Sequence, residues 1–129
     1  MSSVPAYAPV AEILAAVREN VMGVSETVLS TVDGLLVAAD TEGSHPESVA
    51  ALSASAHSIG RRLAAEAGGG ALRELVTRSA GRHVVIEAVG ERALLTVIGD
   101  EGLDMAGLGR ELLGTVERLE AVLRGDTPA

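Results

Sequence analysis

The chain has 129 residues, a length that fits one domain, and 47% of them are apolar. It contains no Cys, which excludes disulfides, thiolate nucleophiles and cysteine-ligated zinc. The net charge is −8 and every basic residue is Arg, so the basic footprint of a nucleic-acid-binding protein is missing.

The first helix is predicted from the spacing of apolar residues after Pro9. Residues 1–8 are expected to form a flexible tail, and a proline fits the first turn of a helix because its missing N–H has no partner there. The helix should end near Asn20, since Gly23 follows shortly afterwards. Its apolar positions at helical spacing are Val10, Ile13, Leu14 and Val17.

A β-hairpin is predicted next. Residues 24–32 are rich in β-branched side chains, and residues 35–39 form a second β-prone run. Asp33-Gly34 separates the two runs, and this dipeptide is the strongest short-range hairpin signal.

A long helix is predicted from Pro46 to about Ala67, and it ends at the glycines 68–70. One apolar stripe, expected to pack on the core, has spacings of three and four residues. The remaining surface is built largely of small residues. The apolar stripe comprises Val49, Leu52, Ala56, Ile59 and Leu63.

Three strands and a last helix complete the chain. The strand at 72–79 carries several charges and is expected at a sheet edge, where charge discourages unwanted pairing. The strands at 83–89 and 92–98 are apolar at consecutive positions, which is typical of burial on both faces. The helix at 104–124 follows, and residues 125–129 should form a tail. The predicted order is α-β-β-α-β-β-β-α.

Three local motifs add to this order. They are Gly23-Val24 before the first strand, the run at 32–38 (Val-Asp-Gly-Leu-Leu-Val-Ala) and the run at 108–112 (Leu-Gly-Arg-Glu-Leu). With the element order, they resemble the Roadblock/dynein-light-chain family over residues 9–124. Small bacterial members of that family are found beside Ras-like GTPases, and some accompany a sensor-kinase-like protein.

The resemblance implies a profilin-like α+β sandwich: a five-stranded antiparallel sheet of order 2-1-5-4-3, with the first and third helices on one face and the second on the other. It also implies a homodimer, in which the third strands pair and the second helices pack together. The small-residue face of the second helix supports this, because such a face permits close helix approach; the alternative is a solvent-facing Ala/Ser surface. The predicted interface residues are Ala51, Ala54, Ser55, His57, Ser58, Arg61, Leu72, Glu74, Val76 and Arg78.

No metal or cofactor site is expected. His45, His57 and His83 lack metal-ligand spacing and favour structural or surface roles, with His57 at the dimer contact. The glycines at 68–70 are not a phosphate-binding loop, because that motif requires a Lys.

The charged clusters have simple interpretations. Asp100, Glu101 and Asp104 fit a turn and a helix N-terminus better than a calcium loop. Arg61-Arg62 fits a solvated helix end; an acidic partner surface and an arginine finger are the alternatives. No catalytic constellation is present, so the chain is not expected to be an enzyme.

The first functional hypothesis is a cytoplasmic, homodimeric regulator or scaffold that binds a small Ras-like GTPase. A sensory or ligand-binding module is the second, and it would require a pocket lined by convergent polar groups. The core positions carry almost no polar residue, which counts against that module. The third is a purely structural dimer in a complex with a sensor-kinase-like protein. Neither a signal peptide nor a membrane-spanning segment is predicted.

Overall fold

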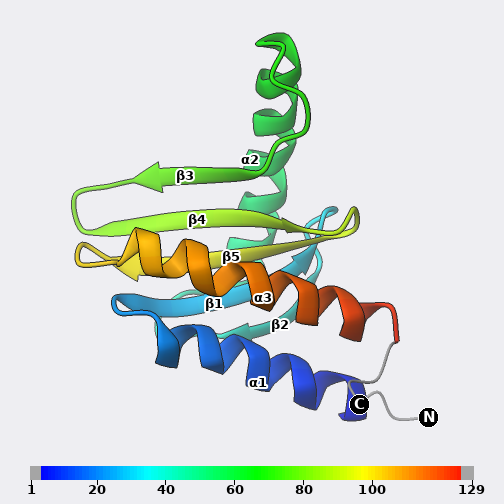
Figure 1. The fold of residues 1–129 in the computed structure, drawn as a ribbon, viewed down its shortest axis with the longest axis vertical. Coiled ribbons are helices and arrows are strands. Elements are labelled where there is room, and N and C mark those ends of the chain that lie inside the picture. Colours follow the sequence, from blue (N-terminus) through cyan, green and yellow to red (C-terminus); the bar gives the residue numbers. More distant parts are fainter. Residues whose placement is uncertain (1–3, 126–129) are drawn as a thin grey trace.

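The computed structural model describes residues 4–125, and its elements follow the predicted order (Figure 1). The helices are α1 (Val4–Asn20), α2 (Pro46–Glu66) and α3 (Met105–Leu123). The strands are β1 (Val24–Thr31), β2 (Leu36–Asp40), β3 (Glu74–Arg78), β4 (Arg82–Val89) and β5 (Ala93–Asp100).

The five strands form one antiparallel sheet in the order β2-β1-β5-β4-β3, as the family resemblance implied. β5 occupies the centre, and seven consecutive residues of it, from Ala93 to Gly99, are buried. This burial confirms that a strand with consecutive apolar residues is covered on both faces. β3 lies at an edge, as its charges predicted.

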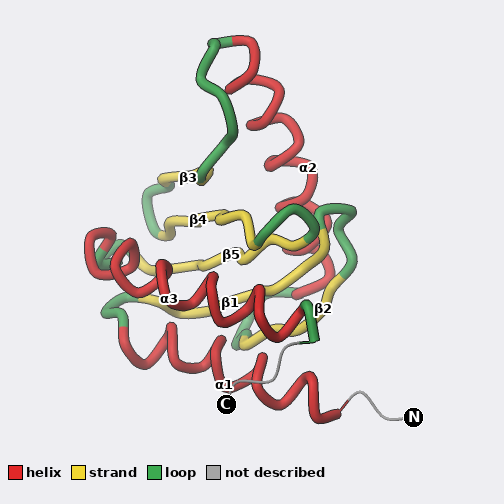
Figure 2. The backbone as a smooth tube through the Cα atoms, turned by 45° about the vertical axis from the view of Figure 1, so that its right-hand side comes forward, coloured by secondary structure: helices red, strands yellow, loops and turns green. Residues whose placement is uncertain are grey.

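α1 and α3 lie side by side across one face of the sheet (Figures 1 and 2). The main hydrophobic core fills the space between these helices and the strands, and it is built from Leu and Val in place of aromatic side chains. Burying one such side chain stabilises the fold by roughly 1.5–3 kcal/mol. The fully or almost fully buried residues of this core include Val10, Leu14, Val17, Leu29, Leu95, Val97, Leu108, Leu112 and Leu119.

α1 begins at Val4, five residues before the predicted start at Pro9. Pro5 occupies the first-turn position predicted for Pro9, and Pro9 lies inside the helix. The predicted N-terminal tail is therefore wrong for residues 4–8. The other tail residues, 1–3 and 126–129, lie outside the described part of the chain.

The predicted hairpin is present, and its turn shows why Gly follows Asp. The N–H of Thr31 donates to the carbonyl of Leu35 over an N···O distance of 2.8 Å, which leaves three residues in the loop. Gly34 has a φ of 93°, in the left-handed region that suits the last residue of such a loop.

α2 covers the opposite face of the sheet, over β1, β2 and β5, and its C-terminal half continues past β3 (Figures 1 and 2). The helix ends at Glu66 with Ala67 as its C-cap, and Gly68 follows with a φ of 72°, which confirms the predicted glycine stop. None of the helices among residues 4–125 is long and apolar enough to cross a membrane.

Candidate interaction surface

β3 forms one edge of the sheet, and no other strand of residues 4–125 covers it. Just beyond β3, the N–H of Ser79 donates to the carbonyl of Arg82 over an N···O distance of 3.0 Å. Hydrogen-bonded and non-hydrogen-bonded pairs alternate along an antiparallel ladder. The backbone N–H and C=O groups of Glu74, Val76 and Arg78 therefore point away from β4, towards the open edge.

One end of β3 places two carboxyl groups beside each other, and the other end places an arginine beside a histidine. Glu74 pairs with Glu87 of β4, and Arg78 pairs with His83. By the same alternation these are non-hydrogen-bonded pairs, in which side chains lie closer together. Burial raises the pKa of Glu87 to about 7, with the charge of Glu74 and a hydrogen bond between the two carboxyl groups adding to the rise. Within one chain, the Glu74 end of the β3 edge therefore holds two carboxyl groups that disfavour each other's ionisation.

The orientation of α2 differs from the prediction. The apolar stripe that was expected to face the core is largely exposed: Leu52 is 70%, Ile59 66% and Leu63 68% accessible. The face packed on the sheet is instead small or polar, and its buried residues are Ala50, Ser53, His57 and Gly60.

Close approach of the helix explains this orientation. A Cβ atom added to Gly60 would lie 3.0 Å from Cδ2 of Leu72, so a larger residue at this crossing would require its neighbours to move. Ser53 accepts a buried hydrogen bond from Oγ1 of Thr96 at an O···O distance of 2.7 Å. Small side chains and a polar contact hold α2 against the sheet, which leaves the large apolar side chains facing outwards.

An apolar groove runs beside α2, over strands that the helix leaves uncovered. It encloses about 210 Å³, and its walls come from α2 on one side and from β3, β4 and β5 on the other. The lining residues are Val49, Leu52, Ser53, Ala56, Thr77, Val84, Ile86 and Ile98.

The residues predicted for a dimer interface occupy three different environments. Glu74, Val76 and Arg78 lie on the open edge strand, and Leu72 lies just before it. On α2, the exposed positions are Ala51, Ser55, Ser58 and Arg61, with Ala54 partly buried. His57 is only 7% exposed and packs under α2. Leu52, Ile59 and Leu63, which form the apolar stripe, are not among the residues predicted for this interface.

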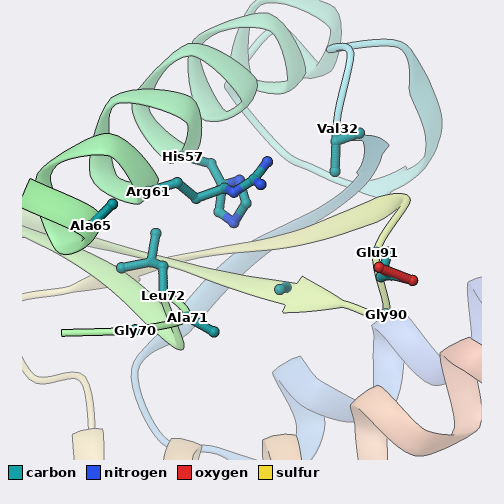
Figure 3. Close-up of a pocket in the computed structure, with 10 residues that line it drawn as sticks. Val32, His57, Arg61, Ala65, Gly70, Ala71, Leu72, Gly90 and Glu91 are labelled. Atoms are coloured by element: carbon teal, nitrogen blue, oxygen red, sulfur yellow. The ribbon is translucent and has the colours of Figure 1, made fainter. Parts of the chain in front are cut away.

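A separate cavity of about 420 Å³ lies on the other side of α2 (Figure 3). The side chains of His57 and Arg61 project into it from the helix, and Glu91 lies across from them on the β4–β5 turn. The complete lining is Val32, His57, Arg61, Ala65, Gly70, Ala71, Leu72, Ala88, Gly90 and Glu91.

The side chains of His57 and Arg61 have no hydrogen-bond or ion-pair partner among residues 4–125. Burial lowers the pKa of His57, and the positive charge of Arg61 lowers it further. The expectation that buried positions carry almost no polar residue is therefore wrong. The layer between α2 and the sheet contains His57 together with the Ser53–Thr96 hydrogen bond.

Glu26 is a second buried titratable group on the α2 side of the sheet, at 2% exposure. Its Oε2 accepts a hydrogen bond from the N–H of Gly43 at 3.2 Å and lies 3.9 Å from Nη1 of Arg82. Burial acts to raise its pKa, but hydrogen bonds from Ser44 and from the backbone of residues 42–44 outweigh burial and lower it. This carboxylate fastens the loop before α2 to β1.

Two acidic residues of the predicted cluster at 100–104 bond the backbone. Asp104 caps α3 by accepting a hydrogen bond from the N–H of Gly107 at 3.0 Å, and Asp100 accepts one from Gly102 at 2.8 Å. These contacts confirm the predicted turn and helix N-terminus. Among residues 4–125, no group of three or more His, Asp or Glu side chains is placed to hold a metal ion.

The chain is a small α+β sandwich with the sheet order 2-1-5-4-3. Its open sheet edge lies beside a helix with exposed apolar residues, and together these features describe a class of small α+β domains. Residues 10–99 match the sequence model of the Roadblock/LC7 domain. The chain belongs to the Roadblock/LC7 domain family.

Solved structures share this fold. A Roadblock/LC7 domain from Streptomyces avermitilis gives a TM-score of 0.82 at 23% identity, over 88% of this chain and 96% of that chain. MglB in a tetrameric arrangement gives 0.86 at 19% identity, over 97% and 94%. Myxococcus xanthus MglB gives 0.83 at 15% identity, over 95% and 93%. A comparison with curated protein sequences finds no significant match.

Proposed function

We propose that this protein is a non-enzymatic, cytoplasmic homodimer that binds a small Ras-like GTPase and biases its nucleotide cycle. The observation that carries the self-association is the combination of an open β3 edge with an exposed apolar stripe on α2. An exposed strand edge and a neighbouring apolar patch are both features that proteins normally cover.

The position of α2 fits a second copy. Its C-terminal half extends past β3, so in a two-fold dimer joined at β3 it would lie over the partner's sheet (Figure 1). There Ile59 and Leu63 would meet the partner's apolar groove, which α2 of that copy leaves open. The two α2 helices would then run side by side and antiparallel.

The GTPase assignment rests on membership of the Roadblock family, whose small bacterial members are found beside Ras-like GTPases. The paired α2 helices would present a surface that holds the GTPase's switch loops in one arrangement. A protein that favours one switch conformation alters nucleotide exchange or hydrolysis without contributing a catalytic group. A sensor-kinase-like protein is a further partner that such a scaffold would serve.

The test uses the full chain and the small Ras-like GTPases encoded in the same genome, each loaded with GDP or with a non-hydrolysable GTP analogue. We expect one of them to bind and to change its rate of hydrolysis or exchange. Leu63→Glu should weaken both dimerisation and GTPase binding, whereas Leu113→Glu, at an exposed position on α3, should weaken neither. Absence of binding and of any rate change across all candidates would overturn the GTPase assignment.

The cavity beside His57 supports a second candidate function, the binding of a small anion. A buried histidine and an arginine without partners, four residues apart on one helix, offer N–H donors to a carboxylate or phosphate group. The cavity volume lies within the range of small-molecule sites.

This candidate is tested with acetate, glutamate and inorganic phosphate, followed by the chemical shifts of the His57 ring. A bound anion should raise the pKa of His57, opposing the effect of Arg61. Arg61→Gln should abolish that response, whereas Arg62→Gln, at the adjacent exposed position, should preserve it. Unchanged His57 shifts with all three anions would exclude the function.

A further inference from the structure

We infer that two copies of the chain join their β3 strands in an antiparallel register centred on Val76, which places Glu74 opposite the partner's Arg78. This inference rests on the proposed homodimer and adds to it the register and the charges that select it. It follows from the ladder between β3 and β4, together with the charges along β3.

Backbone geometry restricts the possible registers. The groups free to bond a partner strand are those of Glu74, Val76 and Arg78, because the intervening residues bond to β4. In an antiparallel pair, directly opposite residues must both point their N–H and C=O groups towards each other or both point them away. Each even-numbered residue of β3 must therefore face an even-numbered residue of the partner.

Among the allowed registers, the one centred on Val76 pairs all five residues of β3. It sets Val76 opposite its own copy in a hydrogen-bonded pair, with a Glu–Arg pair at each end. A shift of two residues in either direction leaves part of the strand unpaired and places a charged residue opposite Val76. Both the number of pairs and the charges therefore select the same register.

The charges then form two rows across the joined sheet, on the face that carries α1 and α3. Each row runs from Glu87 through Glu74 to the partner's Arg78 and the partner's His83. Every chain holds one pair of adjacent carboxyl groups, Glu74 and Glu87, and this pair is unfavourable alone. In the dimer the partner's Arg78 lies beside each Glu74–Glu87 pair, so assembly offsets the repulsion between these carboxyl groups in both chains.

The apolar positions agree with this register. Val76 lies between the two charge rows and would meet its own copy, with its cross-strand neighbour Val85 beside it in each chain. On the α2 face, Leu75 would lie opposite the partner's Thr77, extending the apolar groove of one copy to the other. The edge is thus self-complementary on both faces.

Charge exchange at the two positions tests the register. Glu74→Arg places like charges at both ends of the dimer, and so does Arg78→Glu. Each variant alone should raise the dimer dissociation constant by about tenfold or more, measured by sedimentation equilibrium at 50 mM salt. An equimolar mixture of the two variants should form a heterodimer of near wild-type affinity, because every cross-interface pair is again opposite in charge. The double variant should also dimerise with itself.

Folding does not confound this experiment. Glu74→Arg sets Arg beside Glu87, so that chain gains an opposite-charge pair, and Arg78→Glu changes an exposed position beside His83. We expect both variants to have a melting temperature at least as high as that of wild type, measured at a concentration where wild type is monomeric. Arg110→Glu, an exposed position on α3, controls for the change in net charge.

The outcomes separate the two levels of the proposal. A wild-type chain that remains monomeric at all concentrations would overturn the homodimer itself. A wild-type dimer that both single variants preserve, or single variants that their mixture does not rescue, would overturn the register and leave the homodimer intact. Rescue by the mixture and by the double variant supports the register.

Discussion

At the scale of single residues, Ser53 and Thr96 join α2 to the central strand through a buried hydrogen bond of 2.7 Å. Thr96→Val keeps the side-chain volume and removes the donor, which leaves the Ser53 hydroxyl without this partner; we expect a loss of about 1–2 kcal/mol in the free energy of unfolding. Ser53→Ala should cost a similar amount, and the double variant less than the sum. Urea unfolding at one protein concentration measures the cycle. Strictly additive losses would show that the bond contributes no coupling.

The free energy of unfolding should depend on pH through Glu87, whose pKa is about 7 in the folded chain. In the unfolded chain the same carboxyl has a pKa near its ordinary value of about 4.3. The folded chain holds the proton more tightly, so this contribution is present at pH 4 and is lost as the pH rises from about 4.3 to 7.

Glu87→Gln should therefore flatten the pH dependence of stability between pH 5 and 7. It should also stabilise the protein at pH 8, by about 1 kcal/mol after allowance for solvent screening. Thermal unfolding of dilute protein from pH 5 to pH 8 measures this change, with Glu117→Gln on the exposed face of α3 as the control for loss of a surface charge. A variant that is less stable than wild type at pH 8 would contradict the prediction.

At the scale of elements, the two helices α2 and α3 begin differently. Asp104 caps α3 through the N–H of Gly107, whereas His45, at the start of α2, makes no side-chain cap despite an extended backbone that suits one. Asp104→Ala should cost about 1 kcal/mol, and His45→Ser should gain roughly 0.5–1 kcal/mol. Thermal unfolding of the two variants tests both signs, and a destabilising His45→Ser would show that His45 has another role.

The existence and order of all eight elements could be predicted because strong local signals mark them: apolar periodicity, Asp33-Gly34 and the glycines at 68–70. The orientation of α2 could not. The helix carries two stripes, one apolar and one small, and periodicity does not reveal which faces the sheet. Gly60 decides the matter through its close contact with Leu72, whose place in space depends on the return of the chain after α2.

Part of the candidate site, the open edge strand, was predictable because a local signal in the sequence marks it. Charges on β3 marked an edge strand, so Glu74, Val76 and Arg78 could be assigned to it from the sequence. The cavity beside His57 was not predictable, because its walls come from α2, the segment at 70–72 and two turns that are distant along the chain. Only the folded chain brings these parts together.

At the scale of the whole molecule, the two faces of the sheet are unequally covered. α1 and α3 together seal one face, while α2 alone crosses the other and extends beyond β3 (Figure 2). A second copy would complete the uncovered face, so we expect the folded dimer to be more stable than the folded single chain. Linkage then requires the melting temperature to depend on protein concentration.

The wild-type melting temperature should rise by roughly 2–4 °C for each tenfold increase in protein concentration, given the unfolding entropy of two chains of this size. Ile59→Glu places a charge in the exposed stripe of α2 and should remove this dependence. It should leave the melting temperature in dilute solution nearly unchanged, because Ile59 is 66% exposed in the single chain. Scanning calorimetry over a hundredfold range of concentration makes the comparison. A wild-type melting temperature that does not change with concentration would contradict self-association through this face. A lower melting temperature of Ile59→Glu in dilute solution would show that Ile59 contributes to the core of each copy.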